Sequence, residues 1–449
     1  MIKLFKLFIL INLIFYLSSC SFKNSAGFFN DRLKELEDEI KKKNSKLVFS
    51  ERKMFREEIA GDIQKNILPP LSNKNWTGKY FTSNNYIPHL QYENQKELFY
   101  KSKKLGKNKF GILGSVFEPI LLEDNIFFYD SSGSIYNFSM SQQDLAWKFN
   151  FYKKRYSEVP IKINLKVSNE SLIASDNLGY LYSLKINSGK LNWAKNYGIP
   201  FGSNIKIDDG NIFLLNQDNK YYSVRETDGE INLNLETFPS FLKSEKETNM
   251  SLDIIKNNIY FITSTGELYS INYVTENINW LSTLFISNKE KGSDIFFSSP
   301  IVYKDDQLFF SSSISTYSIN SRNGTVNWEL PFSSNLIPIV LDNFVFIASK
   351  DGFFLNIDAK TGKVVWSKNL FKANKKIKHE KTGDVISLLL VSNQILATTS
   401  KGYFFFIDYR NGNILNYTKA SRSGFFSKPS LVDKKIYILD RNMRILVFK

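Results

Sequence analysis

Short apolar runs alternate with polar turns over most of the chain. In the clearest example, the apolar residues 353–357 are followed by a polar turn at 358–363 and by the apolar residues 364–366. Gly362 can adopt the positive φ that a tight turn requires. The pattern predicts a β-hairpin, and the preceding apolar run at 344–347 adds a strand to it. The expected unit is an antiparallel meander of three or four strands.

This hairpin returns along the chain with the pattern Gly-x-apolar-x-Trp, at 189–193, 324–328 and 362–366. The copy at 276–280 differs in its turn residue, and two further copies keep the turn without the Trp. The phase markers are Trp147, Trp193, Leu233, Trp280, Trp328, Trp366 and Asn416, and successive steps between them are 46, 40, 47, 48, 38 and 50 residues. A period of about 40 to 50 residues with several strands per repeat is typical of a β-propeller.

The two ends of the repeat region predict how the ring closes. The last repeat, residues 434–448, stops before its fourth strand, whereas residues 97–102 form an apolar strand without a neighbouring hairpin. If the early strand completes the late repeat, no sheet edge is left open at the junction. Seven complete repeats and one shared repeat predict an all-β fold, an eight-bladed propeller spanning residues 73–449.

One large aromatic side chain occupies the same place in most repeats. An aromatic at a fixed position can bury a large apolar area against the next repeat. We therefore expect blade-packing roles for Trp147, Trp193, Trp280, Trp328 and Trp366.

The repeats resemble those of quinoprotein-like (PQQ-type) propellers, in which a strand is followed by Asp or Asn, a Thr-Gly-Lys turn and a Trp. Residues 356–366 are the best match. In that family the Trp packs between neighbouring blades, as expected here.

The N-terminus predicts export. Lys3 and Lys6 precede an apolar run of 11 residues at 7–17, which is too short to span a membrane and suits a secretory signal. The sequence Leu-Ser-Ser-Cys at 17–20 resembles a bacterial lipoprotein cleavage box, which implies lipidation of Cys20. The alternative is an ordinary signal peptide with an incidental Cys. Ser21, in place of the Asp that retains lipoproteins at the inner membrane, favours the outer membrane.

These features divide the chain into a signal peptide at 1–19, a lipidated tether at 20–72 with a possible short helix, and the propeller. Cys20 is the only cysteine, so the propeller is expected to hold without disulfides. Lys and Arg number 59 against 44 Asp and Glu, a net charge of +15 spread along the chain. For an exported protein, anionic lipid headgroups or an acidic protein face are better partners than nucleic acid.

The sequence offers little catalytic chemistry. Quinone-dependent dehydrogenases with such repeats use a quinone, calcium and an Asp base, and many have a vicinal Cys pair, which this chain lacks. His89 and His379 are far apart, without Cys or clustered carboxylates beside them, and we expect both on the surface rather than in a metal site. Neither a Gly-x-Ser-x-Gly elbow nor a Gly-rich phosphate loop is present. The sequence therefore predicts a binding scaffold without cofactor or metal, and not an enzyme.

The whole chain resembles the BamB family of lipoprotein subunits of the β-barrel assembly machinery. The resemblance rests on the lipoprotein box, the tether, Asn-Trp-Thr-Gly at 75–78, the eight blades and residues 423–429. It implies a protein that is lipid-anchored at the outer membrane, faces the periplasm, and is monomeric within the Bam complex. It also implies binding to the POTRA repeats of BamA and to other Bam subunits, to assist insertion of β-barrel proteins.

The resemblance implies that the partner-binding loops of the family correspond to residues 238–243 and 292–297 of this chain. The contact residues would be Phe241, Leu242, Lys243, Asp294 and Ile295. The match departs from the family pattern because Lys243 replaces an Arg and so offers a point charge instead of a bidentate fork. An apolar residue also replaces a second Asp near Asp294. The alternative is that Phe241 and Phe296 pack under their own loops. Two other functions stay open, a lipid-anchored PQQ-dependent dehydrogenase and a scaffold for another envelope complex or polysaccharide.

Overall fold

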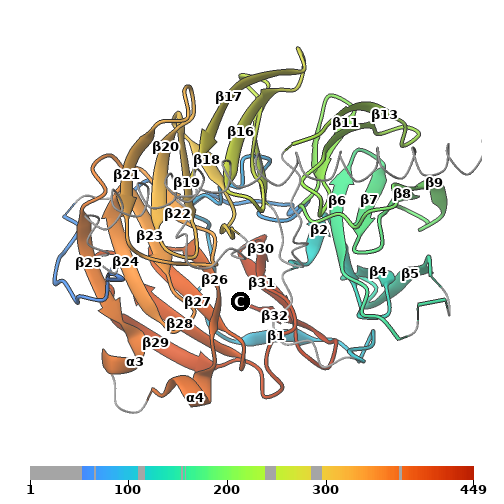
Figure 1. Ribbon diagram of the computed structural model, residues 1–449. Helices are drawn as coiled ribbons and strands as arrows, with labels where there is room; N and C mark the ends of the chain where they lie inside the picture. Colours follow the sequence, from blue (N-terminus) through green and yellow to red (C-terminus); the bar gives the residue numbers. More distant parts are fainter. Residues whose placement is uncertain are drawn as a thin grey trace, which may run out of the picture. The chain divides into compact units, whose positions relative to one another are not determined.

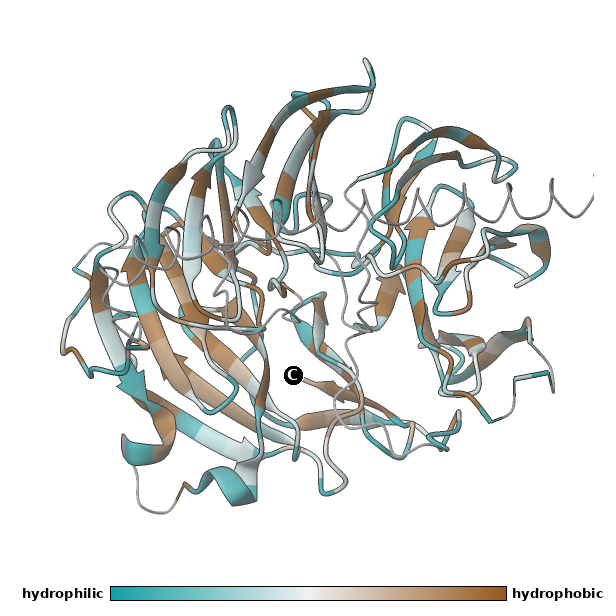
Figure 2. Cartoon of the chain, viewed as in Figure 1, coloured by the Kyte–Doolittle hydropathy of each residue, from teal (hydrophilic) through white to brown (hydrophobic). Residues whose placement is uncertain are grey.

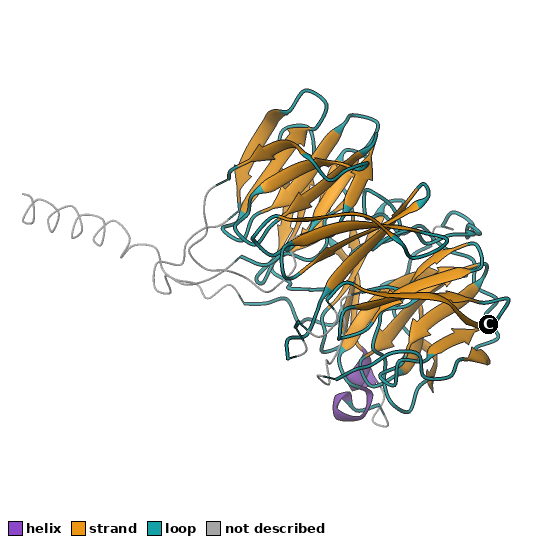
Figure 3. Cartoon of the chain, turned by 90° about the vertical axis from the view of Figure 1, so that its right-hand side faces the viewer, coloured by secondary structure: helices purple, strands orange, loops and turns teal. Residues whose placement is uncertain are grey.

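The computed structural model describes residues 53–64, 67–109, 117–152, 155–156, 158–237, 249–284, 296–373 and 377–449. Met54–Lys449 form one compact unit, and Lys53 is the one described residue of the unit before it. The described residues are almost entirely strands and turns (Figure 3). Among them, no helix is both long enough and apolar enough to cross a membrane.

The strands form eight four-stranded antiparallel sheets, the blades of a propeller (Figure 1). Blades 1 and 2 contain β2 Ile120–Leu122, β3 Asn125–Tyr129, β4 Ser134–Ser139 and β5 Asp144–Asn150, then β6 Ile163–Ser168, β7 Ser171–Asp176, β8 Tyr180–Lys185 and β9 Leu191–Asn196. Blades 3 and 4 contain β10 Lys206–Asp208, β11 Asn211–Leu215, β12 Tyr221–Arg225 and β13 Ile231–Leu235, then β14 Met250–Asp253, β15 Asn258–Ile262, β16 Glu267–Asn272 and β17 Asn277–Thr283.

Blades 5 and 6 contain β18 Val302–Lys304, β19 Gln307–Ser311, β20 Thr316–Asn320 and β21 Val326–Leu330, then β22 Ile339–Leu341, β23 Phe344–Ala348, β24 Phe353–Asp358 and β25 Val364–Asn369. Two short helices follow, α3 Leu370–Ala373 and α4 His379–Thr382. Blade 7 contains β26 Val385–Val391, β27 Gln394–Thr399, β28 Tyr403–Asp408 and β29 Ile414–Lys419. Blade 8 contains β30 Ser430–Val432, β31 Lys435–Leu439, β32 Ile445–Phe448 and β1 Leu98–Lys101.

Blade 8 closes the ring with strands from both ends of the chain. β1 lies antiparallel to β32, with Leu98 opposite Phe448 and Lys101 opposite Leu446. The prediction that an early strand completes the last repeat is confirmed, and with it the count of eight blades. The apolar faces of the strands form the brown interior of Figure 2.

The repeat hairpin forms because its turn residues satisfy the backbone locally. The carboxylate of Asp358 accepts hydrogen bonds from the backbone N–H groups of Lys360 and Thr361, at 3.2 and 2.8 Å, and Gly362 supplies a φ of 72°. An Asp that bonds two residues onward favours a turn over continued strand. β24 and β25 therefore begin at Phe353 and Val364, where the sequence pattern predicts, and they end at Asp358 and Asn369, later than predicted.

The two ends of the propeller differ in what joins the strands. One end contains the turns between the first and second strands and between the third and fourth strands of each blade, and we call it the hairpin end. The connector end has the turns between second and third strands and the connections between blades. Successive antiparallel strands place these two sets of turns at opposite ends.

Neighbouring blades are joined by a recurring tryptophan contact. The indole N–H of Trp328, in blade 5, donates to the carbonyl of Ala359 in blade 6 at 2.8 Å, while its ring lies on Gly362. The same bond to the next blade, at 2.8 to 3.0 Å, is made by Trp147 to Ile186, Trp193 to Glu226, Trp280 to Ser321 and Trp366 to Tyr409. In each Gly-x-apolar-x-Trp copy, the Gly contacts the Trp ring of the preceding blade. The Trp of the same copy bonds to the following blade.

Substituting Gly362 by Ala tests this contact. The new Cβ would stand 2.7 Å from Cγ of Trp328, whereas Gly210, with a similar φ of 69°, has open space around the same position. Gly210→Ala is expected to cost about 1 to 2 kcal/mol for the left-handed backbone. Gly362→Ala should cost about 2 to 5 kcal/mol, because overpacking against the indole is added.

Chemical denaturation followed by tryptophan fluorescence would measure both free energies of unfolding. Equal losses in the two variants would show that the indole contact contributes little to joining the blades.

Candidate functional site

The predicted lipidation and partner-binding residues lie outside the described residues: Cys20, Phe241, Leu242, Lys243, Asp294 and Ile295. Phe296, which follows the second loop, is described and buried at 8% exposure. Its N–H donates to the carbonyl of Ser264 at 2.9 Å, and its ring belongs to the apolar cluster that includes Tyr260 and Ile301. Phe296 is therefore a core residue.

The main polar site at the propeller centre is built by one N-terminal stretch, residues 71–92, which we call the crossing segment. Its backbone bonds to the inner strands of several blades at the hairpin end. Trp76 exchanges backbone hydrogen bonds with Leu121 of β2 at 2.7 and 2.9 Å, and Leu90 donates to Leu390 of β26 at 3.0 Å. Other backbone bonds join it to Val167, Leu252, Tyr303 and Asp433. One stretch of chain thus bridges blades 1, 2, 4, 5, 7 and 8.

Asn85 fixes the middle of the crossing segment. It is fully buried with φ of 58°, and its side-chain N–H₂ donates to the carbonyls of Met250 and Ile301 at 2.8 and 2.6 Å. Its side-chain oxygen accepts from the ammonium of Lys206, which is 2% exposed. A buried charge needs such partners, because loss of hydration is costly. Asn85 therefore ties blades 3, 4 and 5 to the segment.

A second buried group fixes the start of the segment. Glu118 accepts hydrogen bonds from the indole N–H of Trp76 at 3.0 Å and the backbone N–H of Tyr80 at 2.9 Å. Burial raises the pKa of the Glu118 carboxyl, and the nearby positive charges of Lys428 and Lys79 oppose that rise. Burial also lowers the pKa of Lys166, whose ammonium contacts Thr77, to about 8. These groups serve the packing of the crossing segment, a role that the sequence pattern did not reveal.

The prediction that His89 lies on the surface is wrong. The ring is 2% exposed and lies between Leu68, whose carbonyl is 2.8 Å from Nδ1, and Asn393, whose N–H donates to Nε2 at 2.8 Å. Since Nε2 accepts, Nδ1 must hold the proton and donate, so the imidazole is neutral. Burial lowers the pKa of His89. His379 is partly exposed, as expected, and lies 2.8 Å from Asp384.

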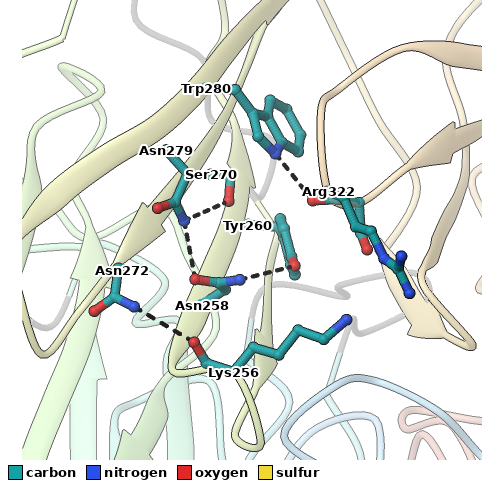
Figure 4. A pocket seen from close by; sticks show the side chains of 9 residues that line it. Lys256, Asn258, Tyr260, Ser270, Asn272, Asn279, Trp280 and Arg322 are labelled. Atoms are coloured by element: carbon teal, nitrogen blue, oxygen red, sulfur yellow. Dashed lines mark hydrogen bonds between the residues drawn. The ribbon is translucent and has the colours of Figure 1, made fainter.

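A groove of about 450 Å³ lies between blades 4 and 5 (Figure 4). Asn279 on β17 donates to Asn258 at 2.9 Å and to Ser270 at 3.2 Å, and Trp280 forms one wall. The other lining residues are Lys256, Tyr260, Asn272, Ser321 and Arg322. Their amides and hydroxyls suit hydrogen bonding to a polar ligand or a peptide, whereas the indole N–H of Trp280 is already donated to the carbonyl of Ser321.

Much of this groove repeats elements of other blades. Asn192 bonds Ser183 at 3.1 Å in blade 2, and Asn327 bonds Ser318 at 3.2 Å in blade 5, at the places that correspond to Asn279 and Ser270. The groove's two cations, Lys256 and Arg322, both bind Asp306 and lower the pKa of its carboxyl. The groove is thus a polar seam between blades, and its lining offers no nucleophile beside a base.

The residues do not fit a calcium and quinone site. Within the described ranges, no group of three or more His, Cys, Asp and Glu is placed to hold a metal ion. At the hairpin end of the inner strands, Lys206, Asn85 and Asn204 bond to one another and to backbone carbonyls, so they are used in holding the crossing segment. We derive no chemistry through such a cofactor.

A family described as outer membrane protein assembly factor BamB matches residues 131–368 and 355–448. Among curated relatives, the proteins named outer membrane protein assembly factor BamB from Shewanella oneidensis and Taylorella asinigenitalis are 24% and 28% identical. The matches cover 25% and 27% of this chain. They span about a third of the length of these relatives, at 36% and 33%.

Solved structures share the fold at low sequence identity. BamB from Moraxella catarrhalis superposes with a TM-score of 0.61 at 13% identity, over 78% of this chain and 98% of that one. Quinohemoprotein alcohol dehydrogenase from Comamonas testosteroni gives 0.62 at 9% identity, over 84% and 80%. A europium-containing methanol dehydrogenase gives 0.60 at 12%, over 81% and 89%. At these identities the likeness shows the fold and not the activity.

The neutral His89 predicts how stability depends on pH. Its pKa is lowered in the folded state, so below about pH 6.5 the unfolded chain binds a proton that the folded chain does not. Its contribution is therefore complete above that pH and is lost as the pH falls toward the lowered folded value. The free energy of unfolding should fall with a slope of up to about 1.4 kcal/mol per pH unit from this group.

Denaturation of His89→Gln between pH 7.5 and 5 should show a smaller slope than the native sequence. An unchanged slope in His89→Gln would mean that the imidazole is not held neutral.

Proposed function

Because the chain belongs to the BamB family of outer membrane protein assembly factors, we propose that it is a non-catalytic scaffold of the β-barrel assembly machinery. The observation that carries this is the family match over residues 131–448, on a ring of eight blades whose shape matches a solved BamB. In this proposal the protein sits at the outer membrane through lipid on Cys20, with residues 20–53 joining the anchor to the compact unit that begins at Met54.

The architecture supports a scaffold because its polar groups are used in holding the ring. Closure through β1, the tryptophan contacts and the crossing segment fix each blade on its neighbours. A rigid frame holds exposed loops in place at little entropic cost on binding, which favours recognition of a partner. The lining of the groove between blades 4 and 5 likewise offers binding groups and no acid–base pair.

The proposed partner is BamA, bound through its POTRA repeats by the connections between β13 and β14 and between β17 and β18. The contact residues remain Phe241, Leu242, Lys243, Asp294 and Ile295, two of them bearing charge among apolar neighbours. Apolar anchors with a few charged groups on a rigid frame are what an interface centre needs.

The dehydrogenases of the same fold define the rival proposal. Asn85 of the crossing segment bonds to Lys206 and to the carbonyl of Met250 at the inner strands, which disfavours a bound quinone there. Stoichiometric quinone binding with calcium-dependent dye reduction would revive the enzyme and remove the scaffold proposal.

Site-specific photo-crosslinking in cells tests the partner and the loop together. A photoreactive residue at Leu242 is expected to crosslink to the POTRA repeats of BamA, identified by mass spectrometry. The matched control is Ile255, which is 93% exposed in the β14–β15 turn at the hairpin end of blade 4, and the buried Phe353 is a second control.

Crosslinks from Leu242 and none from the controls would support both the assembly role and the loop. If Leu242 gives none while the intact protein still copurifies with BamA, the loop assignment fails. If neither contact forms, the scaffold serves another envelope complex.

A further inference from the structure

The connector end of blades 6 and 7 has an excess of exposed cations. We call the basic patch the exposed residues Lys350, Lys372, Lys378, Lys381, Lys401 and Arg422. They come from the β23–β24 and β27–β28 turns, from the connection with α3 and α4, and from the connection after β29. The two helices lie together beyond the ends of β25 and β29 in Figure 1.

Backbone and side-chain hydrogen bonds hold these elements together. The N–H of Val385 donates to the carbonyl of Lys350 at 2.8 Å, which joins the start of blade 7 to a turn of blade 6. The ammonium of Lys401 donates to the carbonyl of Glu380 in α4. The N–H of Leu370 donates to the carbonyl of Gly352 at 2.9 Å. The basic patch is therefore one surface built from adjacent loops.

Few carboxylates offset these cations. Asp351 forms an ion pair with Arg56 at 3.0 Å, and Asp384 lies 2.8 Å from His379. Glu380 remains, and Glu58 also lies at this end, since its carboxylate accepts from the N–H of Asn369 at 3.3 Å. Among the described residues, Lys372, Lys378 and Lys381 form no ion pair. At the hairpin end of the same two blades, the cations Lys360, Lys363 and Arg410 are balanced by Asp342, Asp358 and Asp408. The positive charge thus gathers at one end.

The described chain also reaches the propeller at the connector end. The N–H of Phe55 donates to the carbonyl of Pro331 at 2.7 Å, in the connection between blades 5 and 6. Arg56 lies 5.5 Å from the ring centre of Phe353 and pairs with Asp351 beside Lys350. The 35 positions from Cys20 to Phe55 could reach roughly 110 Å if fully extended. An anchor at Cys20 would therefore be joined to the propeller at its connector end.

We propose that the basic patch binds the anionic headgroups of a lipid bilayer and so turns the connector end of blades 6 and 7 toward the membrane. Each Lys or Arg near an anionic leaflet adds attraction that salt screens. The patch does not depend on the assembly role, and only the argument from the anchor rests on the proposed lipidation of Cys20.

A lipid surface fits this patch better than an acidic protein does. Protein interfaces need apolar or aromatic anchors in a dry centre. None of the exposed large apolar residues of the described chain falls within 350–352, 370–372, 377–384 or 400–402. Spread lysines without such an anchor suit a diffuse layer of phosphates, which requires no shape match.

Vesicle binding of residues 21–449 tests the proposal, because neither the apolar run of the predicted signal peptide nor an acyl chain on Cys20 then contributes. The probes are vesicles of phosphatidylcholine alone and of phosphatidylcholine with 30% phosphatidylglycerol, compared by co-sedimentation. The patch variant changes Lys372, Lys378 and Lys381 to Glu. The matched control changes Lys360, Lys363 and Arg410 to Glu and so alters net charge equally.

We expect binding to the anionic vesicles only, lost in 0.5 M salt. The patch variant should bind at least about a hundredfold more weakly, because loss of each of the three lysine charges costs about fivefold and the new carboxylates weaken binding further. The control should bind less than about fivefold more weakly. Absence of binding, equal binding to both vesicles, or equal loss in the two variants would overturn the proposal.

If the native patch binds no vesicle but the patch variant loses a copurifying acidic protein, the occupant is protein and the lipid proposal is wrong. BamA copurification of the same variants is a separate readout, so failure of the assembly role and failure of the patch remain distinguishable.

Discussion

The fold depends on one contact made many times, an indole of one blade laid on the turn of the next. Trp328 shows it in full, with a hydrogen bond to Ala359 and the ring on Gly362. The contact combines a large apolar burial with one satisfied polar group, so it fixes both distance and rotation between blades. A four-stranded sheet has two faces to cover, and stacking in a ring covers both.

The repeat pattern predicted most of this architecture because each element is local. Gly362, the Asp358 turn and the Trp all act within a few residues or toward the next repeat, and so they leave a period in the sequence. Closure was also predictable, because the last repeat lacks its fourth strand and the strand at 97–102 belongs to no repeat of its own. The loops predicted to bind a partner lie outside the described residues, and those assignments remain predictions.

The crossing segment could not be predicted, and the reason is physical. Residues 71–92 bond to inner strands through their backbone, so the contacts impose no periodic side-chain pattern. Their polar side chains bond to carbonyls of blades that lie far along the sequence, as Asn85 does to Met250 and Ile301. The burial of His89 follows from the same segment, and no residue near it in sequence indicates this. The basic patch was not predicted either, because it forms only where two turns and two connections from different repeats meet.

Closure by β1 has a consequence for how the chain is made. Leu98 and Phe448 are neighbours in space but lie 350 positions apart, so the blade they share exists only once the last residues are present. If the protein is exported, its N-terminal strand arrives first and has no edge to join until translocation ends. Until then the backbone N–H and C=O groups of β1 and of the crossing segment are unpaired, and they must be hydrogen-bonded by water or covered by another molecule. A chain truncated before β32 would leave β1 without its partner strand, and the ring of blades could not close.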